Sequence, residues 1–437
     1  MTDHNTKYGL PLRKTMTIPS TVGDTGVKLC GKTYDIPLTE DVLSKHVLFS
    51  GAIGSGKTTG LHNLLETVIS RLSPKDTMII FDAKGEFRQR FYRPGIDEIL
   101  SCDDHATVIW NLFREIEVDG EEKVETNLRE LINGFFDEKI RRSNAPFFPT
   151  AARDLLYGIA TYIKRTIPRE AQHNEELYLF LRDATVADIV ECLQPHPDLR
   201  GLLDYIDAGC GTTEQTQGVY SELRGLSNEL LIDCFRMVGD FSIRSFIRNP
   251  RGRILFLEYD VATGSVLGPI YKTFFDMAIK ETLSRKNLPL GSAWGNVYFV
   301  ADEFGLLKGL NHISSGLNYS RSLGGKYIIA VQNCRQILDH YGIDNGYSIL
   351  SAFGTLVSFR NTDRATIEFI QDHYGSTREA IHFRDADYSS GLRTVMMPGK
   401  AVEDWDILKL GVGEAIVSVS DYGPEPVLFQ LKGPERY

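Results

Sequence analysis

The stretch GAIGSGKT (51–58) is the feature that most constrains what this chain can fold into. It matches the phosphate-loop pattern G-x-x-x-x-G-K-[ST] at every position. The apolar run HVLFS (46–50) precedes it, and KTTGLHNLLETVISRL (57–72) follows with the apolar period of a helix. TMIIFD (77–82) is the next expected strand. Strand, glycine loop, helix and strand form a βαβ unit, which predicts an α/β fold with a parallel sheet.

A phosphate loop predicts ATP and magnesium as cofactors. Glycines let backbone N–H groups approach the phosphate oxygens, and the start of the following helix adds a positive dipole end. Lys57 would contact the β- and γ-phosphates, and the Thr58 hydroxyl would hold magnesium. The predicted nucleotide-binding residues are Gly51, Ala52, Ile53, Gly54, Ser55, Gly56, Lys57, Thr58 and Thr59.

Two carboxylates, Asp302 and Glu303, end the apolar run VYFVA. In a P-loop ATPase the first would hold magnesium through water, and the second would polarise the attacking water. The alternative is an exposed acidic pair that caps a turn between strand and helix. Asp82 also ends an expected strand and competes for the metal role, together with Lys84 and Glu86 along the site. It ranks second because no carboxylate is adjacent to it.

Gln332 and Arg321 complete the predicted catalytic set. Gln332 ends the run YIIAVQ and would lie beside the γ-phosphate if this strand neighbours the phosphate-loop strand; a structural amide is the equal alternative. Arg321 ends the helix expected after Glu303. It could reach the γ-phosphate of a neighbouring subunit as an arginine finger, or it could be a cation favoured by the helix dipole.

The domain organisation is predicted to be discontinuous. Residues 114–240 are helical in period and contain few strand candidates, so we expect an all-α domain inserted into an α/β domain formed by residues 1–113 and 241–437. The other expected strand regions are 106–113, 252–260, 296–304, 326–333, 355–360 and, near the end, 413–431.

Bulk composition limits the class of protein. The net charge of −10 argues against a uniformly basic surface but allows a narrow basic channel. The six cysteines form no C-x-x-C pair, as in a cytosolic protein with reduced thiols. The start of the chain has no secretory signal, and no run reaches the roughly 18 apolar residues of a membrane-spanning helix.

Six segments occur in the order typical of one family. HVLFSGAIGSGKTTGLHNLLE, IIFDAKGEF, FSIRSFIRNPRGRILFLEYD, VYFVADEFGLL, YIIAVQN and DWDILKLGVGEAIVSV resemble the type IV coupling proteins, the TraD/TraG/TrwB group of conjugation and secretion ATPases. The resemblance covers about 25–430 and implies a RecA-like, hexameric motor with an all-α domain. It implies that the cargo is single-stranded DNA or relaxase-type nucleoprotein, driven toward a secretion channel.

The resemblance also assigns residue roles. It makes Lys57 and Thr58 Walker A residues, Asp302 and Glu303 Walker B residues and Gln332 the motif III glutamine, and Arg321 falls where the family places its arginine finger. Family members usually begin with two transmembrane helices. Here we expect either a naturally soluble relative or a chain whose anchor was removed. We expect it in the cytoplasm or held at the inner membrane by a separate partner.

Two alternative hypotheses also assign ATPase activity to the chain: a soluble HerA-like motor in DNA processing or phage defence, and a receptor for protein secretion substrates. Contacts to DNA would need cationic or stacking groups, although the usual interpretation of each cation is a solvated surface residue, and the aromatic pair can simply anchor a helix. These candidates are Arg248, Arg251, Arg253, Lys308, Lys139, Arg141, Arg142, Phe147 and Phe148. Residues 209–220 are either a recognition loop or an ordinary helix connection.

Overall fold

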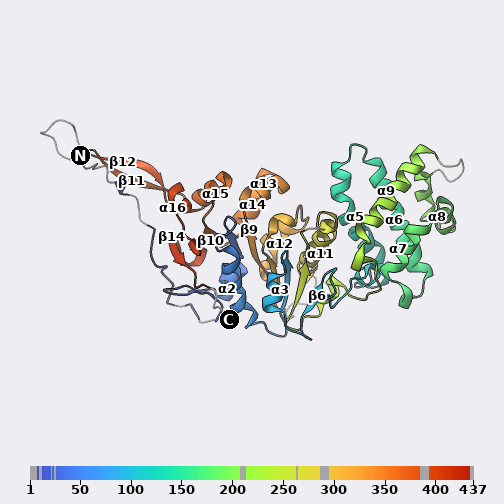
Figure 1. Ribbon diagram of the computed structural model, residues 1–437, viewed down its shortest axis with the longest axis horizontal. Helices are drawn as coiled ribbons and strands as arrows, with labels where there is room; N and C mark the ends of the chain where they lie inside the picture. The colour runs from blue at the N-terminus through green and yellow to red at the C-terminus, as the bar shows by residue number, and fades with distance from the viewer. Residues whose placement is uncertain are drawn as a thin grey trace. The chain divides into compact units, whose positions relative to one another are not determined.

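The computed structural model describes residues 7–8, 12–20, 22–23, 26–206, 213–261, 264–285, 295–383 and 393–433. The chain divides into two compact units (Figure 1). The first comprises Met1–Met78 and Arg285–Tyr437, and the second comprises Ile79–Ser284. No helix in the described ranges is long and apolar enough to cross a membrane.

The first unit is built on six hydrogen-bonded strands. Their order is β14 (Gly423–Gln430), β13 (Glu414–Val419), β10 (Thr355–Phe359), β4 (Val47–Ser50), β9 (Gly325–Val331) and β8 (Val297–Ala301). Strands β10, β4, β9 and β8 are parallel, whereas β13 and β14 are antiparallel additions. Every residue of the four parallel strands is buried, as expected for a sheet covered on both faces.

Register brings the carboxyl ends of the parallel strands to one edge. Ser50 of β4 is opposite Val331 of β9, and Ala301 of β8 is opposite Ile329 of β9. The residues that follow these strands therefore meet at the same edge. The helices of this unit are α1 (Glu40–Ser44), α2 (Lys57–Ile69), α12 (Ile313–Tyr319), α13 (Cys334–Tyr341), α14 (Ile343–Ser351), α15 (Arg364–Tyr374) and α16 (Asp404–Leu408).

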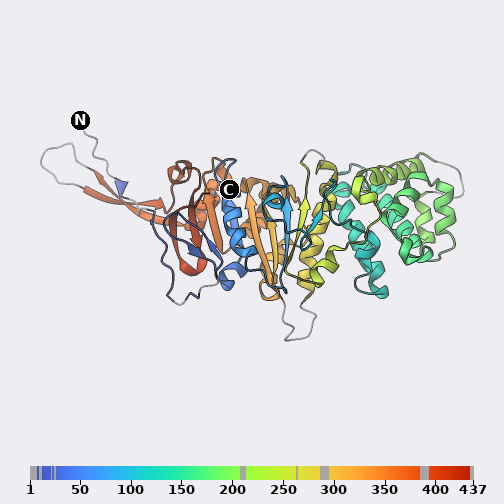
Figure 2. The same ribbon diagram turned by 60° about the horizontal axis from the view of Figure 1, so that its bottom comes forward.

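Two smaller sheets complete the first unit. Strands β2 (Lys28–Leu29) and β3 (Ile36–Pro37) form an antiparallel hairpin. An antiparallel ribbon of β11 (Ser376–Phe383) and β12 (Arg393–Lys400), with β1 (Lys7–Tyr8) along β11, was not predicted (Figures 1 and 2).

The second unit contains three strands and most of the helices. Its strand order is β5 (Thr77–Asp82, with the first two residues in the first unit), β7 (Arg253–Glu258) and β6 (Glu98–Leu100), and β6 and β7 are parallel. Its helices are α3 (Glu86–Phe91), α4 (Leu112–Ile116), α5 (Val124–Arg142), α6 (Phe147–Thr166), α7 (Asn174–Asp183), α8 (Val186–Leu193), α9 (Glu214–Leu230), α10 (Ile243–Arg248) and α11 (Gly264–Ser284).

Helices α5 to α9 form the green part of the ribbon (Figure 1). Among the described residues from 112 to 240, all regular structure is helical. An inserted all-α domain at 114–240 agrees with this content, but its limits stay a prediction, since the compact units divide elsewhere.

The strand predicted at 106–113 is wrong. The short parallel strand is β6, and the chain then turns and starts α4 at Leu112. Asn111 ends the extended segment because its side chain caps the helix, accepting N–H groups from Phe113 at 2.8 Å and Arg114 at 3.2 Å. An apolar run alone does not distinguish a buried strand from a buried helix start.

Candidate nucleotide-binding site

The phosphate loop lies between β4 and α2 with the backbone that its glycines predict. Gly54 and Gly56 have φ values of 74° and 104°, in the left-handed region that favours glycine. A Cβ at Gly56 would lie 2.8 Å from the backbone nitrogen of Gly413, so the close approach itself requires glycine there. The Ser55 hydroxyl donates to the Ala52 carbonyl at 2.7 Å and closes the turn.

Neighbouring strands hold this loop in place. Three backbone hydrogen bonds join it to other segments: Gly51 N to Val331 O at 3.2 Å, Ala52 N to Arg360 O at 2.9 Å, and Gly413 N to Ser55 O at 2.9 Å. The segment before β13 is therefore part of the site. The sequence places Gly413 in the family segment DWDILKLGVGEAIVSV, but no pattern within that segment predicts contact with the loop.

The two residues predicted to hold magnesium, Thr58 and Asp302, lie side by side. Thr58 Oγ1 lies 3.5 Å from Asp302 Oδ1, although 244 positions separate the residues. Asp302 is only 7% exposed, and so is Lys57 at the start of α2. Hydroxyl and carboxylate oxygens are hard ligands, and neighbouring ligands of an octahedral magnesium lie about 3 Å apart. The residues present therefore fit magnesium.

Glu303 and Gln332 form the second contact. The side-chain amide of Gln332 donates a hydrogen bond to the Glu303 carboxylate. Gln332 directly follows β9, which pairs with the phosphate-loop strand β4, so the placement on which its predicted role depends is met. Asn361, which sequence reasoning did not single out, donates to the Gln332 carbonyl at 2.7 Å and fixes the backbone there.

Arg321 lies at the other edge of the strands. It precedes β9 and pairs with Asp41 of α1, which precedes β4. The β9 strand has seven residues and spans roughly 20 Å, which separates Arg321 from the phosphate loop of its own chain. The side chain is 52% exposed, so contact with another subunit is sterically open.

Asp82, the second metal candidate, belongs to the second unit. Its carboxylate accepts backbone N–H groups from Lys84 at 3.3 Å and Arg88 at 2.9 Å. Burial raises the pKa of Asp82, and these hydrogen bonds act in the opposite direction. Lys84 and Glu86 are exposed. The carboxylate thus has a local structural task, and a metal role for Asp82 stays a prediction.

The arginines proposed for DNA contact differ in their surroundings. Arg248 is paired with Asp119 and Glu281. The Arg253 guanidinium lies over the Phe246 ring, 4.4 Å from its centroid. Arg251 is exposed, and so is Lys308 in the first unit. These two exposed cations stay candidates for a DNA contact.

The helical candidates are also partly engaged. Lys139 pairs with Glu222 at 3.0 Å, whereas the ion pair of Arg142 leaves its side chain 72% exposed. Arg141 is exposed. Phe147 is 42% exposed, and Phe148 lies against Gly218 of α9. In the stretch 209–220, residues 209–212 lie outside the described residues, and α9 begins at Glu214.

Comparison with known proteins decides the family. The sequence model of the type IV secretion-system coupling protein DNA-binding domain matches residues 32–397. The chain belongs to this family. Coupling protein TraD of Escherichia coli (strain K12) is 23% identical over 420 residues, which are 90% of this chain and 53% of TraD. This coupling-family chain therefore spans about half the length of that relative.

Solved structures confirm the fold class, a RecA-like P-loop α/β domain with an inserted all-α domain. The coupling-family chain matches the unbound monoclinic form of the bacterial conjugative coupling protein TrwBdeltaN70 with a TM-score of 0.73 and 22% identity, over 99% of this chain and 97% of that chain. TrwB in complex with ADP and Mg2+ matches with a TM-score of 0.70 and 22% identity, over 98% and 97%.

Proposed function

We propose that this coupling-family chain is an ATP-hydrolysing motor that moves single-stranded DNA or nucleoprotein. The observation that carries the proposal is the contact of Thr58 with Asp302 beside the phosphate loop. Two TrwB structures, one in complex with a non-hydrolysable ATP analogue and one with ADP and Mg2+, support ATP and magnesium as cofactors.

Each residue at this edge has a defined task. Lys57 and the loop N–H groups bind the β- and γ-phosphates, and Thr58 with Asp302 holds magnesium. When bound, magnesium neutralises the charge on the transferred phosphoryl group. Glu303 accepts the proton of the attacking water, and Gln332 orients that carboxylate.

The working form is a homo-oligomer, most simply a hexamer, in which Arg321 reaches the nucleotide of the next subunit. Its exposed position at the edge opposite its own phosphate loop supports action between subunits. DNA contacts would come from Arg251 and Lys308, which are exposed. A separate partner would connect the motor to a membrane channel.

The test is ATP turnover by the purified chain with and without single-stranded DNA, combined with particle imaging. We expect DNA to accelerate turnover and to promote rings, and Lys57→Ala to abolish both nucleotide binding and turnover. Turnover that depends on Lys57 but ignores DNA would replace this proposal with the receptor for protein substrates. A wild-type chain that binds no ATP would contradict the nucleotide site itself.

A further inference from the structure

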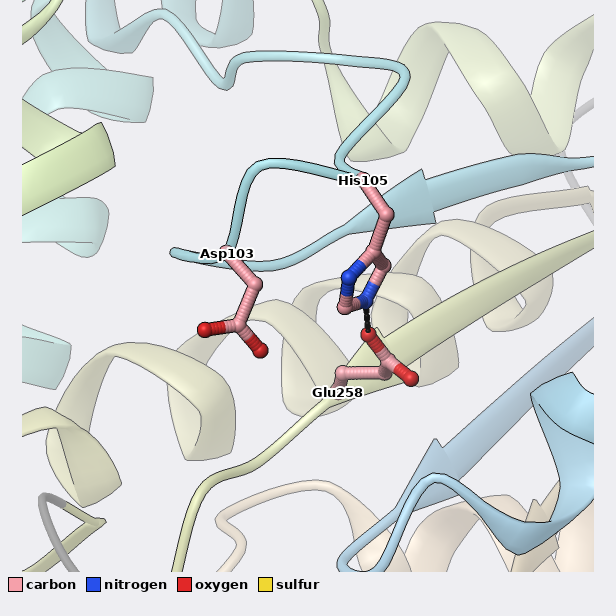
Figure 3. A group of neighbouring side chains, drawn as sticks. All are labelled: Asp103, His105 and Glu258. Atoms are coloured by element: carbon pink, nitrogen blue, oxygen red, sulfur yellow. Dashed lines mark hydrogen bonds and ion pairs between the residues drawn. The ribbon is translucent and has the colours of Figure 1, made fainter.

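A hollow of about 380 Å³ lies in the second unit, and its lining includes no residue of the phosphate loop and neither Asp302 nor Glu303. The ends of β5 and β7 and the loop that follows β6 line it. Three side chains converge there, Asp103, His105 and Glu258 (Figure 3). Each side chain offers one ligand atom, an imidazole nitrogen or a carboxylate oxygen. These three atoms all lie within 4.8 Å of one another.

The backbone fixes both segments that supply these groups. Glu258 is the last residue of β7, and its side chain is only 9% exposed. Asp103 and His105 come from the loop after β6, which is parallel to β7. The Asp103 carbonyl accepts the Ala106 N–H at 3.0 Å and closes this loop. All three side chains are therefore presented at one end of the strands.

Glu258 is held from two sides. Arg88 pairs with its Oε1, and the Nε2 of His105 bonds to its Oε2 (Figure 3). The Arg88 contact resembles the hydrogen bonds that orient ligating carboxylates in metal sites. The His105 contact joins two atoms that can both be metal ligands, and an ion between them would replace it.

The charge around the hollow also favours a cation. Its lining includes two permanent cations, Lys84 and Arg88. Five carboxylates line it as well: Asp82, Asp103, Asp233, Glu258 and Asp260.

We propose that Asp103, His105 and Glu258 bind a divalent transition-metal ion of the Zn²⁺ class. One imidazole with two carboxylates suits zinc and its first-row neighbours, whereas magnesium and calcium prefer oxygen ligands alone. Three protein ligands leave a coordination position open toward the hollow. This ion is additional to the magnesium of the nucleotide, because neither Thr58 nor Asp302 contributes to it.

The test is calorimetric titration of the metal-stripped, nucleotide-free full chain with Zn²⁺. We expect one equivalent to bind, and His105→Ala and Asp103→Asn each to weaken it by about tenfold or more. Asp104→Asn is the matched control, because it removes the same charge from the adjacent exposed position and should leave affinity unchanged. Lys57→Ala should also leave it unchanged, which separates this site from the proposed nucleotide site.

Co²⁺ spectroscopy identifies the ligand atoms. Cys102 lines the same hollow, so a thiolate charge-transfer band would reveal sulfur coordination. We expect weak d–d absorption without that band in the wild type, and its loss in His105→Ala. Far-ultraviolet circular dichroism checks that each variant folds. If His105→Ala does not fold, Asp103→Asn takes its place as the ligand variant. The proposal is overturned if the wild type binds no Zn²⁺, or if both ligand variants bind it with wild-type affinity.

Discussion

Gln332 donates its side-chain hydrogen bond to Glu303, so the strand beside the phosphate loop orients the second carboxylate of the predicted Walker B pair. Under the role proposed for Glu303, a change at the γ-phosphate reaches β9 through these two side chains. The same contact defines how the catalytic assignment is tested.

Glu303→Gln should keep ATP binding and lose hydrolysis. The amide retains the shape of the carboxylate but accepts no proton, so we expect turnover to fall roughly 10²–10⁴-fold. Nucleotide titration and steady-state turnover measure the two effects. Glu191→Gln, at an exposed position on α8, is the matched control. Wild-type turnover in Glu303→Gln would exclude Glu303 as the proton acceptor.

Arg321→Ala should abolish the proposed ATP turnover without unfolding the chain. The Arg321–Asp41 pair is about half exposed on both sides, and such pairs contribute roughly 0–1 kcal/mol to stability. Arg321→Ala and Glu303→Gln subunits, each inactive, are mixed and assayed for ATP turnover. Partial recovery of activity shows that the finger acts between subunits, whereas a persistently inactive mixture argues against it.

Charge reversal at two arginines of the segment RNPRGR should distinguish an arginine that contacts DNA from one that stabilises the fold. Arg251→Glu is expected to reduce DNA-stimulated turnover and to change the free energy of unfolding by less than about 0.5 kcal/mol, because Arg251 is exposed. Arg248→Glu is expected to destabilise the fold by roughly 1–3 kcal/mol, since it places a third carboxylate against Asp119 and Glu281, for which Arg244 remains the cationic partner. Chemical denaturation and turnover assays measure both. Undiminished DNA stimulation in Arg251→Glu would remove this segment as a DNA contact.

His46 predicts a loss of stability in mild acid. Burial lowers its pKa from 6.5 to about 4, and the ring accepts the Tyr327 N–H at 3.3 Å and bonds to the Leu317 carbonyl at 2.9 Å. The unfolded chain therefore takes up this proton near pH 6.5, whereas the folded chain stays neutral there. The contribution of His46 to the free energy of unfolding is therefore fully present above pH 6.5, and about 3 kcal/mol of it is lost as the pH falls toward 4.

The measurement is the free energy of unfolding between pH 7 and pH 4.5 for the wild type and for His46→Asn. Asparagine tolerates the φ of 67° at this position. The difference in slope between the two proteins isolates this histidine from the carboxylates that also titrate. Parallel slopes would contradict the prediction.

Local patterns predicted the part of the site that each segment determines by itself. The phosphate-loop glycines are typical of a backbone with positive φ, and the run before Asp302 is apolar enough to be a buried strand. The sequence therefore predicted both features. The resemblance to coupling proteins placed them together. The sequence did not indicate that Arg248 is paired, because its partner Asp119 lies 129 positions away.

Strand assignment was reliable only where length and neighbours agreed. The three-residue β6 is too short to show a period, so the sequence did not predict it. The longer apolar run 106–113 was wrongly predicted to be a strand. Among the ribbon side chains that the structure describes, Met396 and Met397 are exposed and none is buried, so nothing there marks β11–β12 as part of a core. Its antiparallel register comes from pairing between segments and not from either segment alone.

The hydrogen bond from Gly413 to Ser55 has a consequence for how the protein matures during translation. The phosphate loop emerges from the ribosome early, but the segment that closes against it is made more than 350 residues later. Growing chains fold from the amino-terminal side, so a nascent chain can form β4 and α2 while this clamp is still missing. We expect a nascent chain to bind ATP tightly only after the segment that contains Gly413 has been synthesised.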